Sequence, residues 1–471
     1  MEQLKWEKLL CTKRIRESRR IKDKSIVRNE FEADYDRIVG SSSVRRLQDK
    51  AQVFPLQKND VVRTRLTHSL EVSAMARSLG NTIGRNLENN TSINFDRKKT
   101  EELSALLQTA GLIHDLGNPP FGHYGETVIR EWAKEKLDSN KEKHLKIEDL
   151  KSRQERLDFE YFDGNVQNLR IVTKLQTMND VYGANFTFGT LATIIKYPYS
   201  SCHTTHPKHK FGFFKSEADV VEQIWKETGL KEGVRHPATY LLEAADDIIY
   251  ICDDIEDGVK KGYINWNIVY EEIKEHYKES TEYKELFFRI DSVTPDREMA
   301  ESECILAKVR MFRNNVQTYF FHRVVEEFLK NYDSIMCGCY KGELLQCEKE
   351  FVDRLKGITG KYCFSCNEVS TLELVGYRVI RELLDIFSNI LLGAAEKDIL
   401  DTGTYAGKVY NLISENYKFI SRYDYNNKKY RTFDEMETYD KLQLIIDFIS
   451  GMTDSYAVNL YKQLTGISLP E

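Results

Sequence analysis

The segment 111–126, G-L-I-H-D-L-G-N-P-P-F-G-H-Y-G-E, combines residue types that suit metal chemistry. An apolar helical pattern over residues 103–113 runs directly into His114 and Asp115, and glycines and prolines then end the helix. A carboxylate beside the unpaired carbonyl groups of a last helical turn is unfavourable unless a cation compensates it. Two more candidates approach from the loop side, His123 and Glu126. The pattern favours a metal site, although a lone His-Asp pair also fits a hydrogen-bonded pair that ends a core helix.

A second segment with a potential ligand precedes this one. The run V-V-R-T-R-L-T-H-S starts a helix with Thr67 or Ser69 near its N-terminus, which places His68 at or near the helix start. Taken alone, His68 fits a cap or a hydrogen-bonded core histidine as well as it fits a ligand.

A third segment, residues 236–257, predicts a helix with an apolar face. Three polar side chains share one stripe of this helix at spacings of four residues, Asp246, Tyr250 and Asp254. A carboxylate, an aromatic face and a second carboxylate on one stripe suit a metal ligand, a stacking surface and a hydroxyl acceptor. Three further acidic residues fit a solvated face of the same helix, Asp253, Glu256 and Asp257.

The composition of the 471-residue chain supports a large folded core, because 41% of the residues are hydrophobic. A formal net charge of −6 argues against a dedicated nucleic-acid-binding protein, which would need a basic surface. No apolar run has membrane-spanning length and the N-terminus lacks a signal-peptide core, so we expect a cytoplasmic protein without a membrane segment.

Cysteines and histidines cluster in two other places. Five of the nine cysteines lie between residues 337 and 366 and hint at a zinc knuckle, but their spacing is unusual and free thiols are the favoured interpretation. Three histidines at every third position, His203, His206 and His209, look like a metal cluster. Because Pro207 makes a regular helix there unfavourable, an exposed loop is the better interpretation.

In chain order, His68, the pair His114-Asp115, and Asp246 resemble the H…HD…D signature of the metal-dependent phosphohydrolases called HD-domain proteins. Longer stretches are similar to bacterial deoxyguanosine triphosphate triphosphohydrolases, namely R-R-L-Q-D-K-A-Q-V-F-P-L, R-T-R-L-T-H-S, H-D-L-G-N-P-P-F-G-H-Y-G-E, D-G-N-V-Q, K-Y-P, E-A-A-D-D-I and I-S-G-M-T-D-S-Y-A. The resemblance therefore covers nearly the whole chain.

The resemblance implies an all-α fold, with an HD-domain helical core, a helical C-terminal lobe and few or no strands. Scarce prolines and scarce strand-like alternation agree with it. We expect a basic N-terminal arm (1–27), the HD phosphohydrolase core (28–275) and the C-terminal lobe (276–471), with no Pro/Gly/Ser-rich linker between core and lobe. The arm is also a candidate contact for single-stranded DNA or a neighbouring subunit, although a solvated surface segment is favoured.

The metal ligands implied by the resemblance are His68, His114, Asp115 and Asp246. Asp246 is preferred to Asp247 because the family's ligand directly follows the small residues. Such a mixed nitrogen and oxygen shell suits a divalent ion and does not choose between Mn, Mg and other transition metals.

The reaction implied is hydrolysis of dGTP, or of several dNTPs, to a deoxynucleoside and tripolyphosphate. His123, oriented by Glu126, would donate a proton to the leaving oxygen or act as base for the water. The alternatives are another HD-type phosphohydrolase, either a nucleotidase or a cyclic-nucleotide phosphodiesterase, and a nucleotide sensor with a vestigial site.

The resemblance also implies substrate contacts and an assembly. Two side chains would bind the sugar 3′-hydroxyl, Gln52 and Asp254, beside the stacking Tyr250. Three cations would bind the triphosphate, Arg65, Lys196 and Lys215, with Asn165 and Tyr197 beside them. Family members often have Arg where this chain has Ser455 after M-T-D. A homo-oligomer, often a hexamer, is the assembly expected from the family.

Overall fold

The structure, a computed structural model, describes residues 3–17, 28–54, 56, 62–137, 150–176, 180–292 and 298–468. The chain is 67% helical, which confirms the all-α prediction. Over the described ranges the strands are limited to one antiparallel pair, β1 (Tyr423–Asp424) and β2 (Lys429–Tyr430).

The helices before residue 262 surround the predicted site. In chain order they are α1 (Trp6–Leu9), α2 (Glu30–Val39), α3 (Ser42–Arg46), η1 (Leu47–Asp49), α4 (Arg65–Glu88), α5 (Arg97–Ile113), α6 (Gly122–Lys136), α7 (Arg153–Glu160), α8 (Gly164–Arg170), η3 (Ile171–Leu175), α9 (Phe188–Thr193), η4 (Lys215–Glu217), α10 (Ala218–Thr228) and α11 (Pro237–Lys260).

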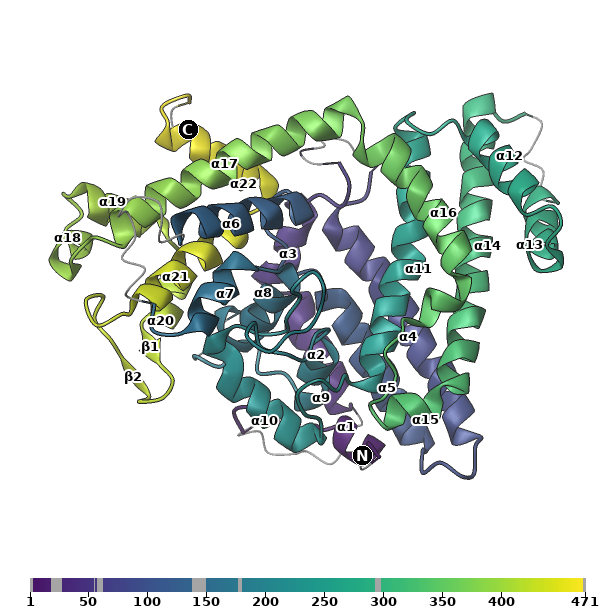
Figure 1. Cartoon of the computed structure of the whole chain (residues 1–471), viewed down its shortest axis with the longest axis horizontal. Helices are drawn as coiled ribbons and strands as arrows, with labels where there is room; N and C mark the ends of the chain where they lie inside the picture. The colour runs from purple at the N-terminus through teal and green to yellow at the C-terminus, as the bar shows by residue number, and fades with distance from the viewer. Residues whose placement is uncertain are drawn as a thin grey trace.

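The later helices flank this core. They are α12 (Trp266–His276), α13 (Thr281–Asp291), α14 (Glu301–Lys330), α15 (Tyr332–Met336), η5 (Leu344–Glu348), α16 (Lys349–Thr359), η6 (Gly360–Phe364), α17 (Asn367–Leu391), α18 (Glu396–Leu400), α19 (Tyr405–Leu412), α20 (Glu415–Ser421), α21 (Thr438–Ser450) and α22 (Asp454–Leu464). In Figure 1, α14 and α16 stand beside α11, and α17 runs along the top above α6 and crosses α22.

Helices α4 and α5 form the centre of the core and pack unusually closely. A β-carbon added to Gly111 would lie 2.7 Å from the backbone of Ser73, and one added to Gly84 would lie 2.9 Å from the backbone of Thr100. The contacts pair the start of one helix with the end of the other, so the two helices are antiparallel. This arrangement brings His68, near the start of α4, to the end of α5.

Local sequence determines where these helices begin and end. The Thr64 side chain caps α4 by accepting from the N–H of Thr67, whose own hydroxyl completes the capping box. Asp96 caps α5, which ends at Ile113 directly before His114, as predicted. Both predicted histidines therefore sit at helix ends.

A buried ion-pair cluster links the core to the C-terminal helices. The Arg170 guanidinium of α8 binds both carboxylate oxygens of Asp447 on α21 and also Glu217, and all three side chains are buried. Because a buried charge is costly unless it is paired, this cluster fixes α8 against α21.

Two segments differ from the sequence-based expectation. The N-terminal arm is only partly solvated over its described residues, since Arg14 is buried and pairs with Asp34 at 2.5 Å. Residues 18–27 of that arm lie outside the described residues. The apolar periodicity of residues 439–464 predicts one continuous helix, but two form there, α21 and α22, because a turn at 451–453 interrupts the pattern.

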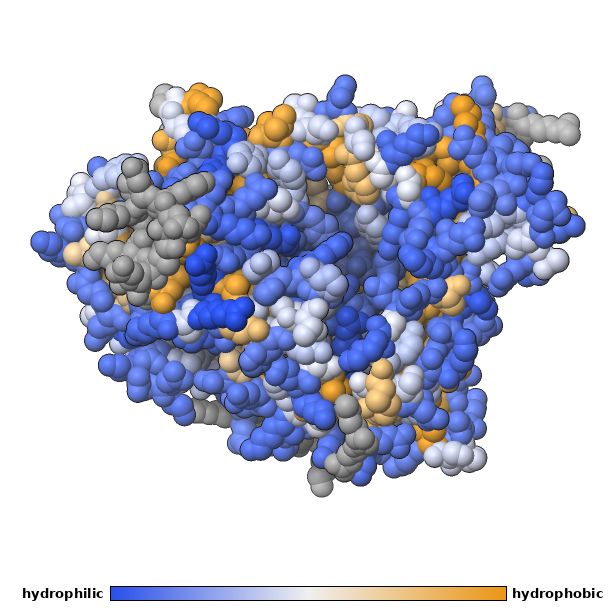
Figure 2. All heavy atoms as spheres, in the orientation of Figure 1, coloured by the Kyte–Doolittle hydropathy of each residue, from blue (hydrophilic) through white to orange (hydrophobic). Residues whose placement is uncertain are grey.

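The outer face in Figure 2 is mainly hydrophilic, with scattered apolar side chains. Within the part of the chain that the structure describes, no helix has the length and apolar character needed to cross a membrane.

The close packing of α4 and α5 makes a stability prediction. We expect Gly111→Ala to lower the free energy of unfolding by about 1–3 kcal/mol, because the new methyl group meets backbone atoms that cannot rotate away. The matched control is Gly357→Ala on α16, where a β-carbon meets nothing within 4 Å and a gain of up to about 1 kcal/mol is expected. Urea denaturation measures both. A Gly111→Ala protein as stable as the wild type would contradict the packing.

Candidate metal centre

Three helices bring the four predicted metal ligands to one point. His68 lies in the first turn of α4, His114 and Asp115 follow the last residue of α5, and Asp246 projects from the middle of α11. An oxygen of Asp246 lies 3.0 Å from Nε2 of His68 and 3.5 Å from Nε2 of His114. Over the described residues, the only compact group of three or more potential ligands from His, Cys, Asp and Glu contains His68, His114 and Asp115.

The hydrogen bonds of His114 suit metal binding. Its Nδ1 lies 2.7 Å from the backbone carbonyl of Gly111, which acts as the acceptor and therefore requires the proton on Nδ1. The lone pair of Nε2 then points to the centre, where this buried atom has no hydrogen-bond partner among the described residues. A second-shell carbonyl that fixes the tautomer in this way is typical of a metal-binding histidine.

The charges at the centre also require a cation. Burial opposes protonation of His114, but the carboxylates of Asp115 and Asp246 outweigh it and raise its pKa to about 9. Burial likewise opposes ionisation of Asp115, and the charges of Arg65 and the two imidazoles overcome it and lower the pKa of that carboxyl. In the metal-free protein, a proton on His114 therefore supplies the positive charge that a bound divalent ion would otherwise supply.

Arg63 fixes the start of α4 against α11. Its guanidinium binds Asp257 at 2.7 Å, Glu256 at 2.9 Å and Asp253 at 3.0 Å. Burial and a hydrogen bond to Glu71 raise the pKa of Asp253. The prediction that Asp253, Glu256 and Asp257 form a solvated face is wrong, because all three are buried around Arg63.

His123 and Glu126 lie near the start of α6, three residues apart. His123 Nδ1 is 3.4 Å from Glu126, whose carboxylate also accepts from Arg130 and from the backbone N–H of Gly164. The hydrogen bond and charge of Glu126 raise the pKa of His123. The His123 side chain is 82% exposed, so it is open to a ligand, whereas Glu126 is buried.

Two glycines let the loop after Asp115 touch the start of α8. A β-carbon on Gly117 would lie 2.0 Å from the carbonyl oxygen of Gly164, and one on Gly164 would lie 2.8 Å from Glu126. Neither position has room for a larger residue. This contact explains physically why H-D-L-G-N and D-G-N-V-Q each contain a glycine.

Each predicted sugar contact has one buried side-chain oxygen that is not bonded to the described part of the protein. Gln52 Oε1 and Asp254 Oδ2 have no hydrogen-bond partner among the described residues. Tyr250 is half-buried on the stripe of α11 between Asp246 and Asp254, and burial together with Asp254 raises its pKa. A buried polar atom without a partner is uncommon and is satisfied by water or by a ligand.

The predicted triphosphate cations are engaged by acidic side chains. Arg65 binds Asp115 at 2.6 Å, and Lys196 binds Glu243 at 3.1 Å. Lys215 pairs with the buried Glu155 of α7.

The other two predicted substrate residues also have protein neighbours. Asn165 binds Asp163 at 2.8 Å, and Tyr197 lies beneath both Lys196 and the guanidinium of Arg235. Tyr197 and Lys196 thus share one polar surface at the side of α11.

Sequence reasoning missed several polar residues at this site. Asn118 donates to Asp115 at 2.5 Å, and Asn168 donates to the backbone carbonyl of His114. Arg235 binds Glu243 at 2.8 Å beside Lys196. Asn118 lies inside H-D-L-G-N-P-P, so the motif itself contained this signal, whereas nothing local marks Asn168 or Arg235.

The other clusters follow the favoured interpretations. All nine cysteines are free, and the 337–366 group forms no three-ligand site among the described residues. The three histidines lie in a loop, where His203 binds Glu232 and His209 binds the carbonyl of Ser201.

Comparison with known proteins identifies the family. A profile for the HD domain matches residues 65–169, which carry three of the four predicted ligands, and one for the phosphohydrolase-associated domain matches residues 421–463. The deoxyguanosinetriphosphate triphosphohydrolase-like protein of Listeria monocytogenes is 39% identical over 99% of this chain and all of its own length. The chain belongs to the deoxyguanosinetriphosphate triphosphohydrolase family of HD-domain proteins.

More distant members of the family align just as completely. A triphosphohydrolase-like protein of Pseudomonas aeruginosa is 32% identical over 99% of both chains. The deoxyguanosinetriphosphate triphosphohydrolase of Klebsiella pneumoniae is 31% identical over 98% of both chains. The chain is therefore a hydrolase of the HD phosphohydrolase family, with a His-His-Asp group that can hold a metal ion.

The geometry makes a specific prediction about neighbouring aspartates. We expect Asp246→Asn to weaken Mn²⁺ binding by more than about 100-fold, since even outer-shell partners of a metal contribute 10- to 100-fold. Asp247→Asn should leave the affinity within about threefold, because Asp247 binds Lys356 at 2.8 Å instead. Titration calorimetry of the purified variants measures both affinities. If Asp247→Asn weakened Mn²⁺ binding and Asp246→Asn did not, the metal ligand on α11 would be Asp247.

Proposed function

We propose that this protein hydrolyses deoxynucleoside triphosphates, including dGTP, to the deoxynucleoside and tripolyphosphate. The observation that carries the proposal is the convergence of His68, His114, Asp115 and Asp246 from three helices. The name of the aligned Klebsiella pneumoniae relative supports the choice of substrate.

The metal ion would be held by these four side chains. When bound, a divalent ion supplies a Lewis acid for the α-phosphate and lowers the pKa of bound water. Asn118 and the carbonyl of Gly111 orient Asp115 and His114 toward that position.

Water attacks the α-phosphorus, the bond to the 5′-oxygen of the nucleoside breaks, and that oxygen receives a proton. His123 is the residue suited to this proton transfer, because its Nδ1 contacts the carboxylate of Glu126. Arg130 holds that carboxylate in place. Either His123 donates the proton to the 5′-oxygen or it accepts one from the attacking water.

The unpartnered acceptors Gln52 Oε1 and Asp254 Oδ2 suit the 3′-hydroxyl, which can donate a hydrogen bond. Tyr250 on the same stripe as Asp246 would lie against the sugar and restrict the space beside C2′. Lys196, with Arg235 and Tyr197 beside it, suits the triphosphate tail after release from Glu243. Arg65, Asn165 and Lys215 remain proposed contacts, with Lys215 requiring release from Glu155.

Product analysis tests the proposal. Purified protein with Mn²⁺ or Mg²⁺ should convert dGTP to deoxyguanosine and tripolyphosphate, at a specificity constant at least about tenfold above that for GTP, or roughly 1.4 kcal/mol. Chromatography and phosphorus NMR identify the products. Orthophosphate or a nucleoside monophosphate in place of tripolyphosphate would favour another HD-type phosphohydrolase, a nucleotidase or a cyclic-nucleotide phosphodiesterase. Assembly into a homo-oligomer remains a prediction that light scattering tests.

A second prediction separates proton transfer from metal binding. We expect His123→Ala to keep metal and dGTP affinity while turnover falls by roughly 10²- to 10⁴-fold, the usual range for one acid-base group. Loss of the metal would make His123 a ligand, and full turnover would exclude it from the reaction.

Glu126→Gln provides the matching control. Glu126 raises the pKa of His123, so its removal should lower that pKa and move the corresponding limb of the pH–turnover profile to lower pH. A limb that falls with rising pH identifies His123 as the acid, and one that rises identifies it as the base.

A further inference from the structure

The turn that carries His123 has a strained backbone at Phe121. Its φ of 60° lies in the left-handed region, which costs roughly 1–2 kcal/mol for a residue with a β-carbon. Phe121 is the N-cap of α6, two positions before His123, so this conformation sets the direction in which α6 begins. Something in the surrounding structure must hold it.

Asp454 is the side chain that contacts this residue. It is the first residue of α22 and is 2% exposed. One carboxylate oxygen accepts from the backbone N–H of Phe121 at 2.9 Å, and the other accepts from the N–H of Ala51 at 3.0 Å. Ala51 directly precedes Gln52. The buried Asp454 carboxylate therefore binds the backbone two residues before His123, the proposed acid or base, and one residue before Gln52, the proposed sugar contact.

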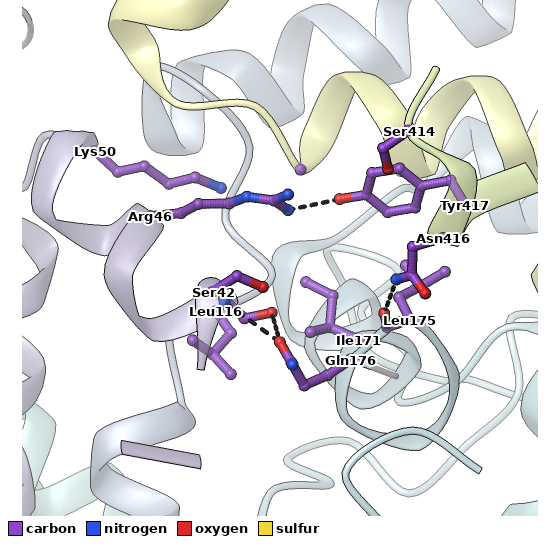
Figure 3. A pocket seen from close by; sticks show the side chains of 12 residues that line it. Ser42, Arg46, Lys50, Leu116, Ile171, Leu175, Gln176, Ser414, Asn416 and Tyr417 are labelled. Atoms are coloured by element: carbon purple, nitrogen blue, oxygen red, sulfur yellow. Dashed lines mark hydrogen bonds between the residues drawn. The ribbon is translucent and has the colours of Figure 1, made fainter. Parts of the chain in front are cut away.

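Lys50 ties the same segments together a second time. Its ammonium donates to the backbone carbonyls of Asn118 and of Ser450, the latter at 3.1 Å. It also lines a cavity of about 220 Å³, where Figure 3 shows it beside Arg46, which donates to the hydroxyl of Tyr417. Lys50 therefore hydrogen-bonds the loop that precedes Phe121 to the end of α21.

We infer that Asp454 is a positioning residue for the reaction, and that it holds the turn at residues 118–121 so that α6 presents His123 to the metal centre. The inference rests on the proposed function for its catalytic consequence. It also assigns a role to the phosphohydrolase-associated region, residues 421–463, which contains Asp454 but none of the proposed ligands.

The chemistry of the two bonds explains why an aspartate is needed. Both partners are N–H donors, and a carboxylate offers one charged acceptor oxygen to each. An asparagine has one acceptor oxygen, and its amide group would face the second N–H donor to donor. Asp454→Asn therefore breaks one of the two bonds with almost no change in shape, and Asp454→Ala breaks both.

The first measurement is a double-mutant cycle with His123→Ala, run at saturating Mn²⁺ and well below each melting temperature. We expect Asp454→Asn to lower kcat by about tenfold or more and Asp454→Ala by more, with Mn²⁺ affinity within about threefold of the wild type. In the His123→Ala background the Asp454→Asn loss should shrink to about twofold or less, because the positioned group is absent.

A matched control separates positioning from general loss of stability. Asp34 is also fully buried and also accepts a backbone N–H, from Thr187 at 3.0 Å, but it lies on α2 and binds Arg14. Asp34→Asn should lower the melting temperature and leave kcat within about twofold. An equal kcat loss in Asp34→Asn, or an Asp454→Asn loss that persists undiminished in the His123→Ala background, would overturn the inference.

A second measurement does not depend on substrate. In metal-free protein, Asp454→Asn should speed amide hydrogen exchange at residues 117–124 and leave α14 unchanged. If the wild type hydrolyses no dNTP, the proposed function fails. The exchange rates then still test whether Asp454 stabilises the turn at residues 118–121. Unchanged exchange at residues 117–124 in Asp454→Asn would contradict the inference that Asp454 stabilises the turn.

Discussion

An oxygen of the Asp246 carboxylate lies between two imidazole rings, and the arrangement of α4, α5 and α11 depends on that contact. Helix α4 contributes His68, α5 ends at His114 and Asp115, and α11 contributes Asp246. The contact places a carboxylate beside two imidazoles, and that negative charge favours a proton or a metal ion at the imidazole nitrogens. The raised pKa of His114 is the metal-free form of that compensation.

Several other features keep the three helices in place. The guanidinium of Arg63 binds acidic residues of α11 immediately before α4 begins, so it fixes the position of His68 relative to Asp246. Gly111 lets α5 approach α4, and Gly117 lets the following loop approach α8. The first of these is charge pairing and the other two are close backbone contacts.

Several polar atoms around the centre lack a hydrogen-bond partner, as do others elsewhere in the described residues, such as Trp266 Nε1 and Tyr410 Oη. His114 Nε2, Gln52 Oε1 and Asp254 Oδ2 are all buried without a hydrogen-bond partner in the described part of the chain. The buried Arg170 guanidinium, by contrast, is fully paired with Asp447 and Glu217. A metal ion or a substrate bound at the centre would give these three atoms partners, which is why we connect them with function.

The sequence by itself determined the helical character of the chain, the helix end at Ile113, the helix start near His68 and the shared stripe of Asp246, Tyr250 and Asp254. These features depend on periodicity, caps and helix-breaking residues, which act over a few positions. Tertiary structure alone determined the burial of Asp253, Glu256 and Asp257. Their sequence pattern fits a solvated face, but Arg63 packs against them. Tertiary structure likewise decided the partners of Lys215 and the contact from Asp454 to Phe121, more than 300 positions away. Side-chain spacing along one helix shows which residues share a face, but only packing with other helices determines what that face meets.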